Sequence, residues 1–105
     1  MKKILQINFK FKTSSELHQA LLKAGWLPPQ ILLDVKGLEW KIWLGNEAEK
    51  TYGGIYLFRD DASVEAYLKG NIVAKLKNNP TISDFEAKVF DIQPEATKVT
   101  RGPVD

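Results

Sequence analysis

The chain has 105 residues, the size of one domain, and no apolar run approaches the roughly 20 residues that a membrane span requires. Its 15 basic and 13 acidic residues give a formal net charge of +2, too balanced for the concentrated basic surface of a nucleic-acid-binding protein. The chain has no cysteine, which excludes disulfides and thiolate metal sites and fits a cytoplasmic location.

The first expected element is a strand over residues 4–11, where apolar and polar side chains alternate. Leu5, Ile7, Phe9 and Phe11 share one face of it. Two lysines precede this run without a long apolar stretch or a small-residue cleavage site, so the start is interpreted as a strand and not as a signal peptide.

A first helix is expected to begin at Thr13, because Thr13 can cap free amides while Glu16 reaches back to the cap. Apolar residues then follow at helical spacing as far as Ala24. A glycine and two prolines interrupt the pattern, so we expect a break and then a short helical piece that ends at Gly37.

Residues 38–44 and 51–59 predict two strands of an antiparallel hairpin joined by a polar loop. Gly53 and Gly54 lie within the second of these strands and are interpreted as a bulge or a close backbone approach. Strict alternation in the first strand places Leu38, Trp40, Ile42 and Leu44 on one face and Glu39, Lys41 and Trp43 on the other.

One continuous helix is expected over about residues 62–78, with Asp60 or Asp61 as its amino-terminal cap. Gly70 lies inside this helix and weakens it by roughly 1 kcal/mol relative to alanine. A last strand is expected over residues 82–92. The polar tail from residue 94 to residue 105 is expected to be frayed or to lie on a partner.

The order β-α-β-β-α-β predicts an α+β fold of the ferredoxin-like kind with a four-stranded antiparallel sheet, formed by residues 1–93. Two helices cover only one face of such a sheet. The other face also carries large apolar side chains, which predicts a homodimer that pairs sheet against sheet, although an open monomer is the alternative. The expected open face holds Gln6, Asn8, Glu39, Lys41, Trp43, Glu86, Lys88 and Phe90.

The residue types exclude several kinds of chemistry. His18 is the only histidine and there is no cysteine, so no metal site is expected.

Aromatic residues could line a pocket for a flat ligand, or could only fill the core. For acid–base chemistry the candidates are Glu39, Glu86, Asp91 or a lysine with a lowered pKa, and the sequence does not choose among them.

Three segments carry a family resemblance: residues 38–43 (LEWKIW), residues 53–58 (GGIYLF) with the acidic pair that follows, and residues 87–91 (AKVFD). Together they resemble the YdhR-type mono-oxygenases of the dimeric α/β-barrel superfamily, which are similar to monooxygenases of antibiotic biosynthesis. The resemblance covers about residues 38–92. It implies a dimeric α/β barrel.

The resemblance also implies a cofactor-independent mono-oxygenase that acts on a small aromatic or quinol-like substrate. A base would remove a proton from the substrate, and the resulting carbanion would react with dioxygen in a dry pocket. A non-catalytic binding or sensor module for a small hydrophobic ligand is the alternative, and a structural interaction domain is a third. Within the matching strands and the first strand, the hypothesis assigns planar-ligand binding to Trp40, Trp43 and Tyr56, oxyanion stabilisation to Lys41 or Asn8, and the base to Glu39.

Overall fold

The structure is a computed structural model that describes residues 1–11, 29–79 and 82–105. Its four strands form one antiparallel sheet in the order β2-β3-β1-β4, as a ferredoxin-like fold requires. The predicted α+β class and all four predicted strands are therefore confirmed. The strands are β1 (Lys3–Phe11), β2 (Leu38–Asn46), β3 (Thr51–Phe58) and β4 (Ile82–Asp91).

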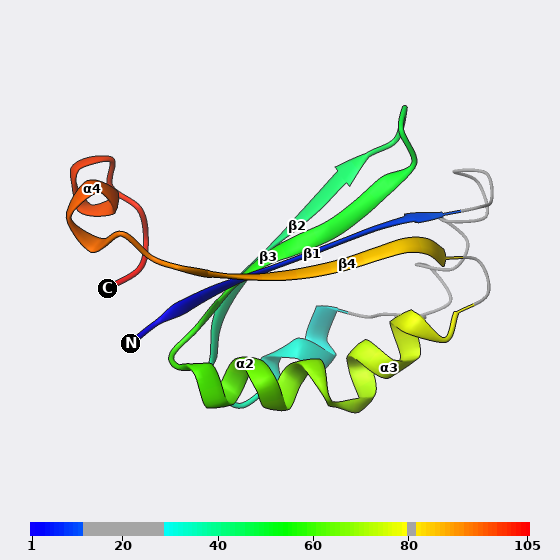
Figure 1. Cartoon of the computed structure of the whole chain (residues 1–105), viewed down its shortest axis with the longest axis horizontal. Coiled ribbons are helices and arrows are strands. Elements are labelled where there is room, and N and C mark those ends of the chain that lie inside the picture. Colours follow the sequence, from blue (N-terminus) through cyan, green and yellow to red (C-terminus); the bar gives the residue numbers. More distant parts are fainter. Residues whose placement is uncertain (12–28, 80–81) are drawn as a thin grey trace.

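Helices η1 (Pro29–Asp34), α2 (Asp61–Leu68) and α3 (Asn71–Lys77) lie on one side of the sheet (Figure 1). The 3-10 helix η1 confirms the short helical piece, but it ends at Asp34 and not at Gly37. Gly37 lies in the turn before β2 with a φ of +83°, which glycine adopts without steric cost. The predicted first helix, from Thr13 to Ala24 and including His18, lies outside the described residues.

The single helix expected over residues 62–78 is wrong, because the chain forms two helices separated at Gly70. Gly70 has extended backbone angles, φ −85° and ψ 178°, and α3 begins directly after it. Glycine loses more conformational freedom in a helix than other residues do. The helix therefore breaks at the residue that favours the helical conformation least. The predicted cap is confirmed, since the Asp60 carboxylate accepts a hydrogen bond from the Ser63 amide at 2.8 Å.

The core lies between the sheet and helices α2 and α3. The four apolar residues of β1 that were predicted to share a face are all buried there. Tyr56 and Phe58 of β3 join them, because residues directly opposite one another in an antiparallel pair share a face. The helices contribute Val64, Tyr67, Val73 and Leu76 to the same cluster.

Strand β2 changes phase at its start, which the sequence did not indicate. Leu38 pairs with Phe58 but Trp40 pairs with Leu57, so a bulge at Glu39 inserts one extra residue. Beyond the bulge, Lys41 lies opposite Tyr56 and Trp43 opposite Gly54. Lys41 and Trp43 therefore lie on the helix-covered face, and their predicted placement with Asn8 on the open face is wrong.

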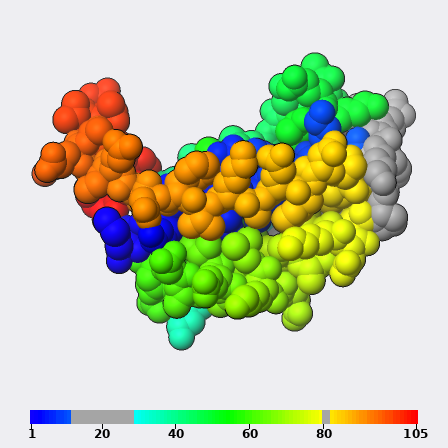
Figure 2. Space-filling view, viewed as in Figure 1, coloured from blue at the N-terminus to red at the C-terminus, as the bar shows by residue number. Residues whose placement is uncertain are grey.

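The open face of the sheet is the side opposite α2 and α3. Register places on it Ile4, Gln6, Asn8, Trp40, Ile42, Ile55, Leu57, Glu86, Lys88 and Phe90. At opposite ends of the sheet, the end of the β2–β3 hairpin and the carboxyl-terminal segment project on this side. The surface between them is hollowed (Figures 1 and 2).

The carboxyl-terminal tail is ordered and packs on its own chain. Residues 94–105 contain the short helix α4 (Pro94–Val99), which the sequence did not predict. The indole Nε1 of Trp40 donates a hydrogen bond to the carbonyl oxygen of Pro103 at 2.7 Å. The sequence predicted a tail that is frayed or lies on a partner, and in the structure the tail packs on its own chain. In the described part of the chain, no helix has the length and hydropathy needed to cross a membrane.

Candidate functional site

Lys41 lies between two aromatic rings on the helix-covered face of the sheet. Its Nζ atom is 3.3 Å from the ring centroid of Trp43 and 4.6 Å from that of Tyr56. Strand geometry produces this arrangement, because Tyr56 is the register partner of Lys41 and Trp43 is two residues along β2 on the same face. We call these three residues, together with Tyr67, the Lys41 cluster.

A pair of buried phenols forms the inner wall of the Lys41 cluster. The hydroxyl of Tyr67 on α2 donates a hydrogen bond to the hydroxyl of Tyr56 at 3.3 Å, and the ring centroids are 5.3 Å apart. Burial raises the pKa of Tyr56 above its ordinary value, with smaller contributions from Tyr67, and burial also raises the pKa of Tyr67. Both phenols therefore stay protonated at neutral pH and can act as hydrogen-bond donors.

The amine of Lys41 is the group in this cluster that titrates near neutral pH. Burial lowers the pKa of Lys41 from 10.5 to about 7, because desolvation disfavours the ammonium form. No carboxylate within residues 1–11, 29–79 and 82–105 forms an ion pair with it. Near pH 7 the amine can therefore accept a proton as a neutral base and hold an anion once it is charged.

Gly54 provides the space that the Lys41 side chain occupies. A Cβ atom at Gly54 would overlap Cε of Lys41 and would lie 3.4 Å from its Nζ. At Gly53 a Cβ atom would instead overlap the backbone carbonyl of Ile7. The predicted close backbone approach is therefore confirmed at Gly53, whereas Gly54 has a second role beside the candidate site.

Of the six residues proposed from sequence, the structure brings Lys41, Trp43 and Tyr56 together. Asn8 and Trp40 lie on the open face, on the other side of the sheet. Trp40 and Trp43 lie on opposite faces of the sheet, as strand alternation predicted. Glu39 lies in the β2 bulge, and its Oε1 accepts a hydrogen bond from Nζ of Lys2 at 2.9 Å.

The remaining carboxylates considered as bases lie in ion pairs away from this cluster. Asp91 pairs with Lys3 across β1 and β4, and this interaction raises the pKa of Lys3. Glu86 lies on the open face, 3.9 Å from Nζ of Lys88. Among the residues that the structure describes, no group of three or more His, Cys, Asp or Glu side chains could hold a metal ion.

Sequence reasoning did not select Tyr67 or Gly54 as site residues. It counted Tyr67 only among the aromatic residues that could line a pocket, and it favoured a backbone role for Gly54 over a ligand contact. Tyr67 lies 11 positions from its partner and on another element, so only the packing of α2 on the sheet joins the two hydroxyls. Its position one helical turn after Val64, a core-type residue, was a usable signal, because that spacing points a tyrosine towards the sheet. Gly54 carried no signal that would separate it from Gly53.

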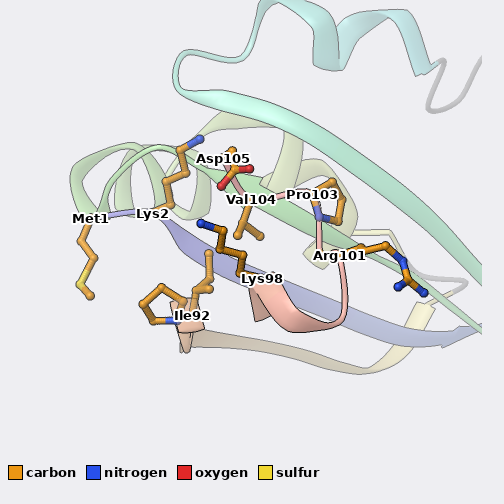
Figure 3. A pocket seen from close by; sticks show the side chains of 10 residues that line it. Met1, Lys2, Ile92, Lys98, Arg101, Pro103, Val104 and Asp105 are labelled. Atoms are coloured by element: carbon orange, nitrogen blue, oxygen red, sulfur yellow. The ribbon is translucent and has the colours of Figure 1, made fainter. Parts of the chain in front are cut away.

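A separate cavity of about 620 Å³ lies between the chain start and the tail. Figure 3 shows Lys2, Lys98 and Val104 around this hollow, while the Arg101 side chain extends away from Lys98. Its walls come from the two residues before β1, from Ile92 directly after β4 and from the tail, so it shares no lining residue with the Lys41 cluster.

A family model described as "Putative mono-oxygenase ydhR" matches residues 4–103. The chain belongs to this family. Membership confirms the resemblance found in the sequence and supports a mono-oxygenase type of function, with the substrate unspecified. No curated protein matches the chain.

Solved structures share the fold at low sequence identity. A protein of unknown function from Nitrosomonas europaea is 23% identical, with a TM-score of 0.69 over 88% of this chain and 89% of that chain. A variant of SnoaB, a cofactor-independent oxygenase from Streptomyces nogalater, is 12% identical, with a TM-score of 0.64 over 90% and 98%.

The haem-degrading protein MhuD from Mycobacterium tuberculosis, with two haems bound in its active site, is 15% identical. Its TM-score is 0.61 over 88% of this chain and 97% of that chain. At these identities the similarity shows the ferredoxin-like fold and does not choose between such chemistries.

Proposed function

We propose that this chain is a cofactor-independent mono-oxygenase that acts on a small aromatic or quinol-like substrate. The observation that carries the proposal is the Lys41 amine, half-buried between the rings of Trp43 and Tyr56 with a pKa of about 7. Enzymes that take protons from weakly acidic carbon or oxygen need a base of this kind, with a pKa near the working pH.

In the proposed mechanism the half-exposed ring of Trp43 stacks on a planar substrate, the buried ring of Tyr56 lies behind the amine, and Lys41 removes the substrate proton. The amine becomes an ammonium ion, and its positive charge then holds the substrate anion. Glu39 is the base predicted from sequence, but its carboxylate is paired with Lys2, so the Lys41 amine is the better placed acceptor. The protonated hydroxyl of Tyr56, which accepts the hydrogen bond from Tyr67, supplies one hydrogen-bond donor behind it.

The oxygen step uses dioxygen as the oxidant and needs no metal or flavin. The substrate carbanion transfers an electron to dioxygen, and the resulting carbon radical and superoxide combine into a peroxide anion, which takes up a proton to become a hydroperoxide. Loss of water from the hydroperoxide of an activated methylene leaves a carbonyl group. One oxygen atom thus remains in the product and the other leaves as water.

A homodimer belongs to the same proposal. Ile42 on β2 and Phe90 on β4 are 51% and 47% exposed on the open face, at opposite edges of the sheet. Apolar side chains spread across a whole sheet face usually mark an interface, and a second copy of the chain would cover them. A cytoplasmic location also belongs here, because the chain has no cysteine.

The test uses tryptophan fluorescence with a panel of small quinols and hydroxylated arenes, followed by an oxygen electrode for each compound that binds. We expect saturable quenching that is lost in Trp43→Phe and kept in Trp40→Phe, because only Trp43 belongs to the Lys41 cluster. Oxygen uptake is expected to fall at least about 100-fold in Lys41→Met, the size of a lost general base.

The outcomes separate the candidate functions. Saturable binding without oxygen uptake by any bound compound would favour the sensor module. If quenching followed Trp40 instead of Trp43, the site would lie on the open face and the proposal for Lys41 would be wrong. A haem titration belongs in the same panel, because MhuD shares the fold and degrades haem.

A further inference from the structure

The position of the Lys41 amine suggests a second kind of reactivity that oxygen chemistry does not require. Its Nζ is 3.3 Å from the ring centroid of Trp43, which is 43% exposed, so an aromatic compound that reaches the amine also reaches this stacking surface. The buried ring of Tyr56, with its centroid 4.6 Å away, lies behind the amine. We propose that Lys41 is a reactive amine that forms a reversible imine with aromatic aldehydes, held against the ring of Trp43.

The balance of the reaction needs only the neutral amine and the aldehyde. The nitrogen lone pair attacks the carbonyl carbon, and the π electrons move to oxygen, which takes a proton to form a carbinolamine. Loss of water then gives the imine. A half-buried site favours this dehydration, because water that would reverse it is partly excluded.

The other lysines show why Lys41 stands apart within the described residues. Lys2, Lys3 and Lys88 have ion-pair partners that hold their ammonium groups. Lys77 lies over the ring of Phe85 at 5.4 Å but is exposed to solvent. It therefore has one aromatic neighbour without desolvation, which makes it the matched control.

Titration supports the same inference. The titratable group that faces Lys41 from β3 is the phenol of Tyr56, and Tyr67 of α2 is bonded to that phenol; the raised pKa values of both keep them neutral. At pH 7 about half of the Lys41 amine is neutral when its pKa is about 7, whereas an amine with a pKa of 10.5 is neutral in roughly one molecule in three thousand.

The experiment treats the full chain with benzaldehyde and sodium cyanoborohydride, which reduces an imine to a stable benzylamine. Peptide mass mapping then measures the labelling rate at each lysine. We expect Lys41 to be labelled at least about tenfold faster than Lys77 at pH 7, with the Lys41 rate levelling off above its pKa.

Two variants complete the test. Lys41→Arg is expected to abolish the fast adduct, and Lys77→Arg to leave it unchanged. The inference is wrong if Lys41 and Lys77 react at similar rates in the wild-type chain, or if a fast adduct persists in Lys41→Arg. Because the wild-type comparison is decisive alone, misfolding of a variant would not remove the test. Failure here would leave oxygen uptake, and thus the proposed function, to be judged separately.

Discussion

At the scale of single residues, Lys41 experiences two opposing effects. Removal of water from around the amine disfavours the ammonium form and lowers the pKa to about 7. The negative faces of the Trp43 and Tyr56 rings attract the ammonium form, at roughly 0.5 to 2 kcal/mol for such a contact. An ammonium group that contacts only rings releases its proton readily. This suits a group that must both take up and release a proton.

The lowered pKa of Lys41 predicts how stability depends on pH. The folded pKa is about 7 and the ordinary value is 10.5, so between these values the unfolded chain binds more protons. The free energy of unfolding therefore rises with pH across this window, and the penalty for Lys41 is fully present below pH 7. Lys41→Met removes the penalty.

The stability difference between Lys41→Met and the wild-type chain is expected to favour the variant at pH 6. It should shrink by at least about 1 kcal/mol by pH 10, since one pKa unit corresponds to about 1.4 kcal/mol. Urea denaturation of both proteins at pH 6, 8 and 10 measures this difference. A constant difference across the three values would show that Lys41 is not desolvated.

Gly53 and Gly54 are neighbours with different expected tolerances to alanine. A methyl group at Gly54 meets the end of the flexible Lys41 side chain, whereas one at Gly53 meets the Ile7 carbonyl in the adjacent strand. Gly53→Ala is expected to destabilise the fold by roughly 1–3 kcal/mol, as overpacking does. Gly54→Ala should cost less than Gly53→Ala and should displace Lys41.

Denaturation midpoints and the rate of aldehyde labelling at Lys41 together test the glycine pair. We expect Gly54→Ala to keep the fold and slow the labelling. Equal loss of stability in both variants would mean that Lys41 cannot move aside, and unchanged labelling in a folded Gly54→Ala would place the amine elsewhere.

At the scale of elements, alternation predicted the strands but not their faces. Polar–apolar alternation located β1 and β2, because a half-buried strand must alternate. The bulge at Glu39 then reversed the phase of β2, and no residue there distinguishes a bulged from a regular strand. The sequence therefore separated Lys41 and Trp43 from Trp40 but placed them on the wrong side of the sheet, together with Asn8.

The helical elements show a similar limit. Gly70 was recognised as a weak point in the predicted helix, but whether a helix weakens or breaks depends on how α2 and α3 pack on a twisted sheet. The sequence likewise left open a lysine with a lowered pKa without saying which one. Burial against Trp43 and Tyr56 makes that choice, and burial is a property of the fold.

Gly37 lies in the turn between η1 and β2 and packs against Ser63 of α2. Its φ of +83° is unfavourable for other residues, its carbonyl accepts a hydrogen bond from the Arg59 amide at 2.9 Å, and a Cβ atom there would overlap the Ser63 hydroxyl. Gly37→Ala is expected to lower the free energy of unfolding by roughly 1–3 kcal/mol through backbone strain and this overlap.

Chemical denaturation of three variants separates the two causes. The double variant Gly37→Ala/Ser63→Ala removes the overlap with the hydroxyl but keeps the backbone strain and the overlap with Cβ of residue 63, so it is expected to recover only part of the loss. Gly37→Asn should cost less in backbone strain, because asparagine tolerates positive φ better than alanine. Full recovery in the double variant would mean that the φ value carries no cost.

At the scale of the whole molecule, the tail covers one part of the open face and leaves the rest exposed. Leu57 lies on that face but is only 1% exposed, and neighbouring Trp40 is bonded to Pro103 of the tail. Elsewhere on the same face, at the two edges of the sheet, Ile42 and Phe90 remain about half exposed. A partner copy would therefore meet the uncovered part of the sheet, next to a ridge formed by the tail.

The proposed homodimer predicts a specific sensitivity to charge on the open face. Ile42→Glu places a carboxylate where a partner sheet would exclude water, so we expect the dissociation constant to rise at least about tenfold, equivalent to about 1.4 kcal/mol. Leu33→Glu is the matched control, because Leu33 is an apolar residue that is 83% exposed on η1, on the other side of the sheet. Sedimentation velocity over a range of concentrations measures both variants. Equal effects of the two substitutions, or a wild-type chain that stays monomeric at every concentration, would show that the open face does not pair with a second copy.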